Sequence, residues 1–202
     1  MCYSVYMTQY REIRADFDRD TIVVYQAFSP TIGKPAVEAG RFVPPFSLGR
    51  MTWIKPSFLW MMERSNWGRK PNQECVLAVR ITRKGWEEAL AAGVLTHPDE
   101  RVYANVDEWR RQSAAALVQI QWDPERSIRG GKLDHRSIQV GLGRGIVSRY
   151  VDEWTVGIVD MTPLVRKLAS MIEIGEVSKA AALLPVERIY PLPIETGRRI
   201  GV

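Results

Sequence analysis

Cationic and aromatic side chains are interleaved along residues 41–70, RFVPPFSLGRMTWIKPSFLWMMERSNWGRK, in a pattern that suits nucleotide binding. Six basic residues stand against one acid, Glu63, so the stretch carries a charge of +5, equal to the net charge of the whole chain. The cations are Arg41, Arg50, Lys55, Arg64, Arg69 and Lys70, and the rings are Phe42, Phe46, Trp53, Phe58, Trp60 and Trp67. Rings beside fixed cations can stack a base or nicotinamide and neutralise phosphates. The alternative is that the rings are core and the cations form a solvated face.

Local signals indicate which of these residues face a ligand. Met51–Ile54 is expected to form a brief strand that Lys55-Pro56 ends, and Ser57 is placed to cap a helix over FLWMMERS. Trp60, Met61 and Met62 then form a core stripe. Trp53 and Lys55, at the end of the strand, are better placed for a ligand.

The composition limits the class of protein. With 202 residues and 46% hydrophobic content, the chain is expected to form one soluble domain over residues 1–202. No apolar run is long enough to span a membrane, and the N-terminus lacks the apolar core of a secretory signal, so we expect no membrane association and a cytoplasmic location. Two cysteines, Cys2 and Cys75, and two histidines, His97 and His135, argue against a metal site.

The periodicity along the chain predicts an α+β fold with mixed, mostly antiparallel sheets and short flanking helices. We expect residues 1–20 to be an irregular lead-in, 41–49 and 127–133 to be loops, and 191–202 to be a loose or docked tail. Strands are predicted at 21–28, 51–54, 74–82, 114–122, 136–142, 154–161 and, at a sheet edge, 186–190. Helices are predicted at 30–39, shortened by Pro35, and at 58–65, 83–92, 105–111, 147–151, 162–172 and 179–184.

Several longer strings carry a family resemblance. RFVPPF, RMTWIKPSFLWMMERS and RSIQVGL, together with IRADFDRDTIVVYQAFSP and QWDPERS, resemble the domain-of-unknown-function family 4291 over essentially the whole chain. The resemblance implies membership of that family. It implies no chemistry, because the family has no assigned activity to transfer to this chain.

The order of the elements is similar, at the level of the fold, to the mono-ADP-ribosyltransferases. In that fold a first strand ends in an Arg or His that holds the NAD ribose, and the matching position here is Gln26. A second strand offers a hydroxyl beside the nicotinamide pocket, which corresponds to Thr52 with Trp53. A third element supplies a Glu that stabilises the oxocarbenium-like transition state, and the matching residue is Gln139. Because glutamine carries no negative charge, the resemblance requires a substitute carboxylate, such as Glu125 or Asp134.

Two function classes follow, and a third remains open. The first is an NAD-dependent transferase or glycohydrolase that acts on an anionic acceptor, nucleic acid included, with Gln139 and Lys55 as catalytic residues. Its cofactor-binding residues would be Gln26, Arg41, Arg50, Thr52, Trp53, Arg136 and Ser137. Arg136, Ser137 and Gln139 form a polar row on an otherwise apolar strand, which is costly unless they bond each other or a ligand.

The second class is a binding module for a nucleotide or single-stranded nucleic acid that performs no chemistry. The third is an interaction protein with an exposed aromatic surface. The sequence does not indicate an oligomeric state.

Overall fold

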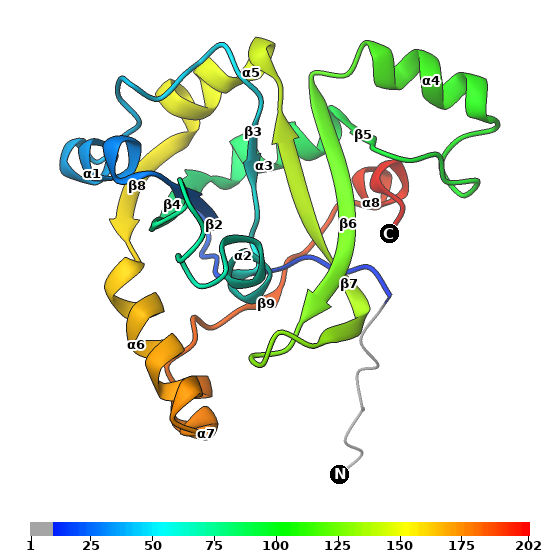
Figure 1. The fold of residues 1–202 in the computed structure, drawn as a ribbon. Helices are drawn as coiled ribbons and strands as arrows, with labels where there is room; N and C mark the ends of the chain where they lie inside the picture. Colours follow the sequence, from blue (N-terminus) through cyan, green and yellow to red (C-terminus); the bar gives the residue numbers. More distant parts are fainter. Residues whose placement is uncertain (1–9) are drawn as a thin grey trace.

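The computed structural model describes residues 10–202 and has an α+β architecture built on two main sheets (Figure 1). The first is antiparallel, in the order β2-β4-β8, from Thr21–Phe28, Cys75–Thr82 and Thr155–Asp160. The second has the order β3-β7-β6-β5, from Thr52–Ile54, Lys132–Leu142, Val118–Arg126 and Gly93–Leu95. Within it only the β5–β6 pair is parallel. The predicted fold class is therefore confirmed as α+β with mostly antiparallel sheets.

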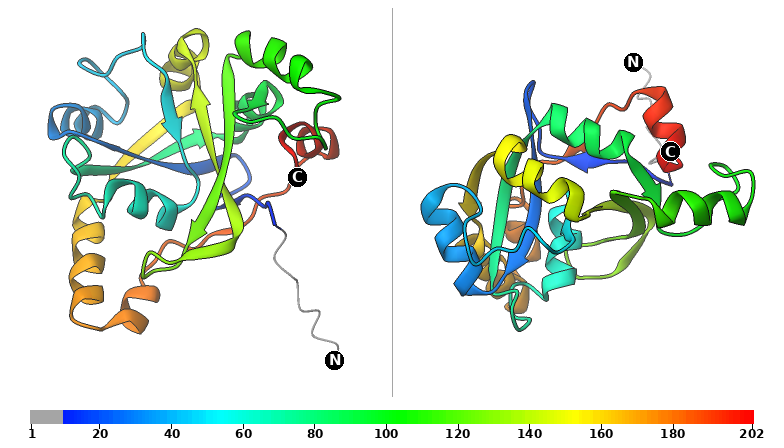
Figure 2. Two further views of the ribbon diagram at one scale, coloured as in Figure 1. Left: turned by 45° about the vertical axis from the view of Figure 1, so that its right-hand side comes forward. Right: turned by 90° about the horizontal axis from the view of Figure 1, so that it is seen from above.

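Helices lie around both sheets, as the two views of Figure 2 show. They are α1 (Pro30–Ala39), α2 (Phe58–Ser65), α3 (Arg83–Ala91), α4 (Val106–Ala114), α5 (Arg144–Arg149), α6 (Thr162–Glu173), α7 (Val177–Ala181) and α8 (Ile194–Ile200). A π-helical turn, η1 (Tyr150–Trp154), continues α5. Helix α1 runs through Pro35 to a left-handed cap at Gly40, so the proline does not shorten it. None of the helices in residues 10–202 is long and apolar enough to cross a membrane.

The two sheets meet where β3 ends. The backbone of Lys55, one residue beyond β3, pairs with Tyr25 of β2, whose N–H donates to the Lys55 carbonyl (2.6 Å). Side chains also cross this junction, because Gln26 Nε2 donates to Thr52 Oγ1 (2.7 Å). Helix α2 follows immediately and packs against both β2 and β6, in front of the junction in Figure 1. The junction therefore brings strands of both sheets and one helix to a single place.

The larger hydrophobic core lies between the sheets and helix α3. It is centred on Trp86, Leu90 and the inward faces of β2, β4, β6 and β7. Gly85 permits a close approach there, since a Cβ atom at this position would lie 2.3 Å from the Trp154 ring. A second cluster packs α2 and α6 against the other face of β2 and β4, around Phe58, Met62 and Leu168. Both faces of the β2–β4 pair are thus covered, which explains why these strands read as nearly continuous apolar runs.

The lead-in and the edge strand differ from the sequence prediction, whereas the tail takes one of its two predicted forms. Within the predicted lead-in, β1 (Arg14–Ala15) pairs with β9 (Arg188–Ile189) as a small separate sheet, which is shorter than the strand expected at 186–190. The tail is docked, because α8 buries Ile200 and the Ile200 carbonyl accepts a hydrogen bond from Trp122 Nε1 (2.8 Å). No local pattern could fix either contact, since each joins segments far apart in the sequence.

The strand predicted at 114–122 is wrong at both ends. Helix α4 extends to Ala114, and β6 begins only at Val118. The strand then continues through Asp123-Pro124 to Arg126, where the pairing with β7 shifts register. A proline is tolerated in a strand at such an irregularity because the missing N–H costs no ladder hydrogen bond there. Asp123, just beyond the predicted strand, is consequently itself a strand residue.

Candidate functional site

A cavity of about 480 Å³ opens at the junction of the two sheets. Its wall comes from the end of β2, from β3 and the residues beside it, from α2, from the 72–73 loop, and from the middle of β6 and β7. Most of the polar groups are amides, with one hydroxyl, Thr52, and two cations, Lys55 and Arg64. Of the nine candidate residues taken from the sequence, the cavity gathers Gln26, Thr52, Trp53, Lys55 and Gln139.

Lys55 is the most unusual group in the wall. Its side chain is 5% exposed. Its backbone pairs with Tyr25, which fixes the position from which the side chain extends. The Nζ atom lies 5.0 Å from the centre of the Trp60 ring and makes no hydrogen bond or ion pair with residues 10–202. Burial, and next the positive charge of Arg64, lower the pKa of Lys55 to about 7, against an opposing effect of Asp123. A buried amine without an acid partner is costly unless a ligand compensates it.

Arg64 adds a second cation from helix α2. It is exposed at the cavity wall, and its guanidinium forms no ion pair within the described residues. The Ser57 side chain caps the helix by accepting from Trp60 N–H (3.1 Å), and Glu187 accepts from Phe58 N–H (2.7 Å). These contacts fix the start of the short helix that carries Arg64. Two uncompensated cations on one cavity favour an anionic ligand.

A carboxylate beside the cavity orients two of its amides. Asp123 Oδ1 accepts from Gln121 Nε2 (2.9 Å), and Asp123 Oδ2 accepts from Gln139 Nε2 (2.7 Å). Gln121 and Gln139 are paired residues of β6 and β7, so they lie side by side. With both amide nitrogens engaged, neither Oε1 atom has a hydrogen-bond partner among residues 10–202. These oxygens can therefore accept hydrogen bonds from hydroxyl groups of a ligand.

Gln26 is engaged entirely within the protein. Its Nε2 donates to Thr52 Oγ1 and to the Trp53 carbonyl (3.1 Å), and its Oε1 accepts from Tyr150 Oη (2.6 Å). The side chain is 3% exposed. Gln26 therefore ties β2 to β3 and to η1, and it positions the cavity wall rather than presenting a free amide.

Among the six rings of the 41–70 stretch, Trp53 is the one in the cavity wall. Its ring packs on the backbone of β7, where a Cβ atom at Gly141 would lie 2.9 Å from it. Phe42, Phe46, Phe58 and Trp67 are buried or partly buried against apolar neighbours, and Trp60 is buried with its ring centre 5.0 Å from Lys55 Nζ. The alternative interpretation, that the rings are core, therefore holds for Phe42, Phe58 and Trp67, whereas Phe46 lines a neighbouring cavity and Trp60 contacts Lys55.

The remaining cations of the stretch are dispersed. Arg41 lies 3.6 Å from Asp152, and Arg69 lies 2.6 Å from Glu173, so acids from distant segments compensate both. Arg50 lines a neighbouring cavity of about 290 Å³ with Phe46, a cavity that shares Thr52 with the first. Neither Arg41 nor Arg50, both expected to bind the cofactor, lines the main cavity with Lys55.

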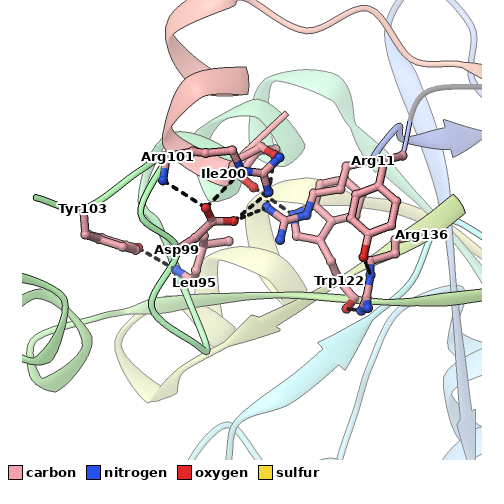
Figure 3. Close-up of polar contacts among 10 residues, drawn as sticks. Arg11, Leu95, Asp99, Arg101, Tyr103, Trp122, Arg136 and Ile200 are labelled. Carbon is pink, nitrogen blue, oxygen red and sulfur yellow. Dashed lines mark hydrogen bonds and ion pairs between the residues drawn. The ribbon is translucent and has the colours of Figure 1, made fainter. Parts of the chain in front are cut away.

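Arg136 and Ser137 also lie outside the main cavity. Arg136 belongs to a separate polar network, where its Nη1 donates to the Trp122 carbonyl (2.9 Å) and its Nε bonds Tyr10 Oη (Figure 3). In the same network Arg11 bridges Asp99 (2.7 Å) and the Gly201 carbonyl (3.1 Å), and so joins the two chain ends. Ser137 is buried opposite Asp123 in the β6–β7 register. The polar row on β7 is therefore divided, and only Gln139 contributes to the cavity.

Three functional candidates were missed from the sequence. Arg64 was counted among the cations of residues 41–70 but not chosen as a site residue, Gln121 was placed in a predicted strand, and Asp123 lay just beyond it. A signal for the last two was present, because Gln119, Gln121 and Asp123 alternate with apolar residues in VQIQWD. Glu125 and Asp134, the carboxylates expected to substitute for the missing Glu, do not line the cavity.

No group of three or more His, Cys, Asp or Glu side chains in residues 10–202 converges in a way that could hold a metal ion. Cys75 is a buried free thiol, and Cys2 lies outside the described residues. The polar groups that line the cavity are cations, amides and the Thr52 hydroxyl, with the Asp123 carboxylate beside them.

No curated protein matches the chain. A family model described as Domain of unknown function (DUF4291) matches residues 12–190.

Proposed function

We propose that this chain, which belongs to the DUF4291 family, binds a nucleotide in the cavity at the sheet junction and uses NAD as an ADP-ribosyltransferase or NAD glycohydrolase. The acceptor would be anionic, and nucleic acid is one such acceptor. The observation that carries the proposal is the pairing of two uncompensated cations with two unengaged amide oxygens on one cavity. A nucleotide offers the complementary groups, since its phosphates need cations and its ribose hydroxyls need acceptors.

Each part of the ligand has a counterpart in the wall. Arg64 and the protonated form of Lys55 would hold the diphosphate, and Gln121 and Gln139 would accept from a ribose. Trp53, packed on β7, would contact the nicotinamide ring, with Thr52 beside it. Gln26, Thr52 and Gln139, the positions that match the ADP-ribosyltransferase pattern, all line one cavity, which supports that assignment.

Asp123 supplies the charge that a glutamine cannot. In the transferase step the bond between nicotinamide and ribose breaks, nicotinamide leaves with the bonding electrons, and positive charge develops on the ribose. The Asp123 carboxylate, hydrogen-bonded to Gln139, would stabilise that charge, and the acceptor or water would then add to the ribose carbon. Asp123 does not line the cavity itself. Gln139, which does, connects it to the ligand site through their hydrogen bond.

The test is binding and turnover on the purified full chain. NAD at about a hundred times its dissociation constant should add about 2.7 kcal/mol to stability and raise the melting temperature by several degrees. Lys55→Gln and Arg64→Gln should each weaken NAD binding about tenfold or more. Asp123→Asn should leave NAD binding nearly intact and reduce nicotinamide release about a hundredfold. Absence of both an NAD-induced shift and nicotinamide release, with every acceptor tried, would refute the proposal.

A second candidate is a nucleotide-binding module without catalysis. It is favoured by one observation, that no carboxylate of residues 10–202 forms part of the cavity wall. A melting shift with ATP, GTP or short single-stranded RNA but not with NAD, measured at low salt, would support this module and exclude the transferase.

A further inference from the structure

Lys55 differs from every other lysine of the chain. The other lysines, all of them exposed, are Lys34, Lys70, Lys84, Lys132, Lys167 and Lys179. Lys55 is buried, has no acid partner in residues 10–202, and opens onto a cavity with room for a sugar phosphate. Binding a phosphate does not require such burial, since exposed cations bind phosphate as well. Phosphate binding alone therefore does not explain why Lys55 is buried.

Burial and a neighbouring cation are the two means by which proteins turn a lysine into a nucleophile. The groups that face the amine are Arg64 and the Trp60 ring from α2, and Asp123 from β6. Together with burial, these groups lower the pKa of Lys55 to about 7. A large share of Lys55 is therefore the neutral amine at neutral pH. An exposed lysine, with a pKa near 10.4, is almost wholly charged and unreactive there.

We propose that Lys55 is a covalent site that condenses with the aldehyde of a phosphorylated, ring-opened sugar, while Arg64 holds the phosphate. The Nζ lone pair adds to the aldehyde carbon, and a proton moves from nitrogen to oxygen to give a carbinolamine. Loss of water then leaves an imine, so amine and aldehyde are converted to imine and water with no redox change. The inference rests on the proposed function, because the cavity must accept a phosphorylated sugar.

Ring-opened ADP-ribose is such an aldehyde, and it would arise at the same site when nicotinamide leaves and water adds. Gln121 and Gln139, whose Oε1 atoms are unengaged, would accept from the sugar hydroxyls. Lys55 would thereby bind the hydrolysis product reversibly and hold it against release.

The direct test uses pyridoxal 5′-phosphate, an aldehyde that carries a phosphate, as the probe. The full chain is treated with less than one equivalent at neutral pH, reduced with borohydride, digested and analysed by mass spectrometry. We expect the label on Lys55 at about ten times or more its level on any exposed lysine. A label spread over the exposed lysines, with Lys55 unmodified, would overturn the proposal.

Variants separate the amine from the phosphate anchor. Lys55→Arg keeps a cation and removes the nucleophile, so the selective label should vanish, and Lys55→Met serves if the arginine does not fit. Arg64→Gln should slow labelling by the phosphorylated probe severalfold but not by pyridoxal, which lacks the phosphate. Equal effects on both probes would refute the role of Arg64. Lys84→Arg, an exposed lysine on α3, is the matched control and should change nothing.

ADP-ribose with cyanoborohydride tests the biological class of aldehyde. An ADP-ribosyl adduct on Lys55 supports the inference, and its absence at saturating ADP-ribose overturns the assignment of this sugar. Labelling of Lys55 by the pyridoxal probe in a protein that neither binds nor cleaves NAD would refute the transferase while leaving the reactive lysine in place. NAD cleavage without any labelling of Lys55 would refute the reactive lysine and support the transferase.

Discussion

Lys55 and Gln26 illustrate two ways in which a polar side chain can be buried. Gln26 uses three hydrogen bonds to satisfy its amide, whereas Lys55 has none within residues 10–202. The hydrogen bonds of Gln26 add to the stability of the protein. The unpaired amine of Lys55 reduces stability but leaves the amine available to a ligand. Both effects are measurable by substitution.

Lys55→Met should stabilise the protein, and the gain should be larger at low pH. The pKa of Lys55 is about 7 in the folded protein and 10.5 in the unfolded chain. Between these values the unfolded chain binds more protons, so the stability of the wild type rises with pH and approaches that of the variant. Thermal unfolding at pH 6 and at pH 9.5 measures the difference, which should be several degrees at pH 6 and smaller at pH 9.5.

The control is Lys84→Met, on the exposed face of α3. It should shift the melting temperature equally at both pH values. A Lys55→Met gain that does not vary with pH would show that the amine is not desolvated in the folded protein.

Gln26→Met should destabilise the protein by about 2–4 kcal/mol, because it leaves three buried partners without a hydrogen bond. Tyr150→Phe removes one of the three bonds and should cost about 1–2 kcal/mol. In urea unfolding the double variant should lose less than the sum of the single losses, since both changes break the same bond. Strict additivity would contradict the hydrogen bond between these residues.

At the scale of elements, α2 depends on its cap. The helix has only eight residues, too few to be stable alone, and it carries Arg64 and Met61 into the cavity wall. Its first turn is fixed by Ser57 and by Glu187, which comes from the far end of the chain. The position of a cavity residue is thus controlled by a contact outside the cavity.

Ser57→Ala should cost about 1 kcal/mol of stability by removing the capping bond to Trp60 N–H. It should also weaken nucleotide binding, because Arg64 loses a fixed position. Ser57→Asp retains a capping oxygen and should restore most of the stability in denaturant titrations. An alanine variant as stable as the wild type would argue against the cap.

Helix α8 should contribute to stability through one face. Ile200 is fully buried, whereas Ile194 on the same helix is 74% exposed. Ile200→Ala should cost about 2–4 kcal/mol and alter the fluorescence of Trp122, whose indole bonds the Ile200 carbonyl. Ile194→Ala is the matched control and should change stability by less than about 0.5 kcal/mol. Similar costs at both positions would mean that α8 is not docked as Figure 3 shows.

For the whole molecule, the decisive feature is that both main sheets contribute to one cavity. A ligand held there contacts β2 and β3 from different sheets, so its binding should stabilise the molecule as a unit. The charge available to that ligand is limited, since only two of the six cations of residues 41–70 line the cavity.

NAD binding should therefore depend weakly on ionic strength. With two cations engaged, affinity should fall by about tenfold or less between 50 and 200 mM salt, whereas a contact with six to ten phosphates would cost about 10³–10⁵. Calorimetric titrations at several salt concentrations measure the slope. A steep slope would indicate a polyanion spread over the surface instead of a ligand confined to the cavity.

The sequence by itself determined the elements that local patterns encode, and it also determined the family. The apolar runs of β2 and β4 and the cap at Ser57 follow from short-range sterics and hydrogen bonding, and all of them stand in the structure. Trp53 and Lys55 line the cavity, but so does Met61, which the sequence analysis assigned to the core stripe of α2, and Lys55 is buried rather than open.

Only the tertiary structure decided which polar groups share the cavity. Arg41 and Arg69 are compensated by Asp152 and Glu173, more than a hundred residues away, and Asp123 reaches Gln139 through a strand pairing that continues past a proline. The physical reason is that charge compensation and strand register depend on distances in space, which a local pattern does not contain. Residue types alone therefore indicated a basic, aromatic site, and packing reduced it to two cations, one ring and the amides held by Asp123.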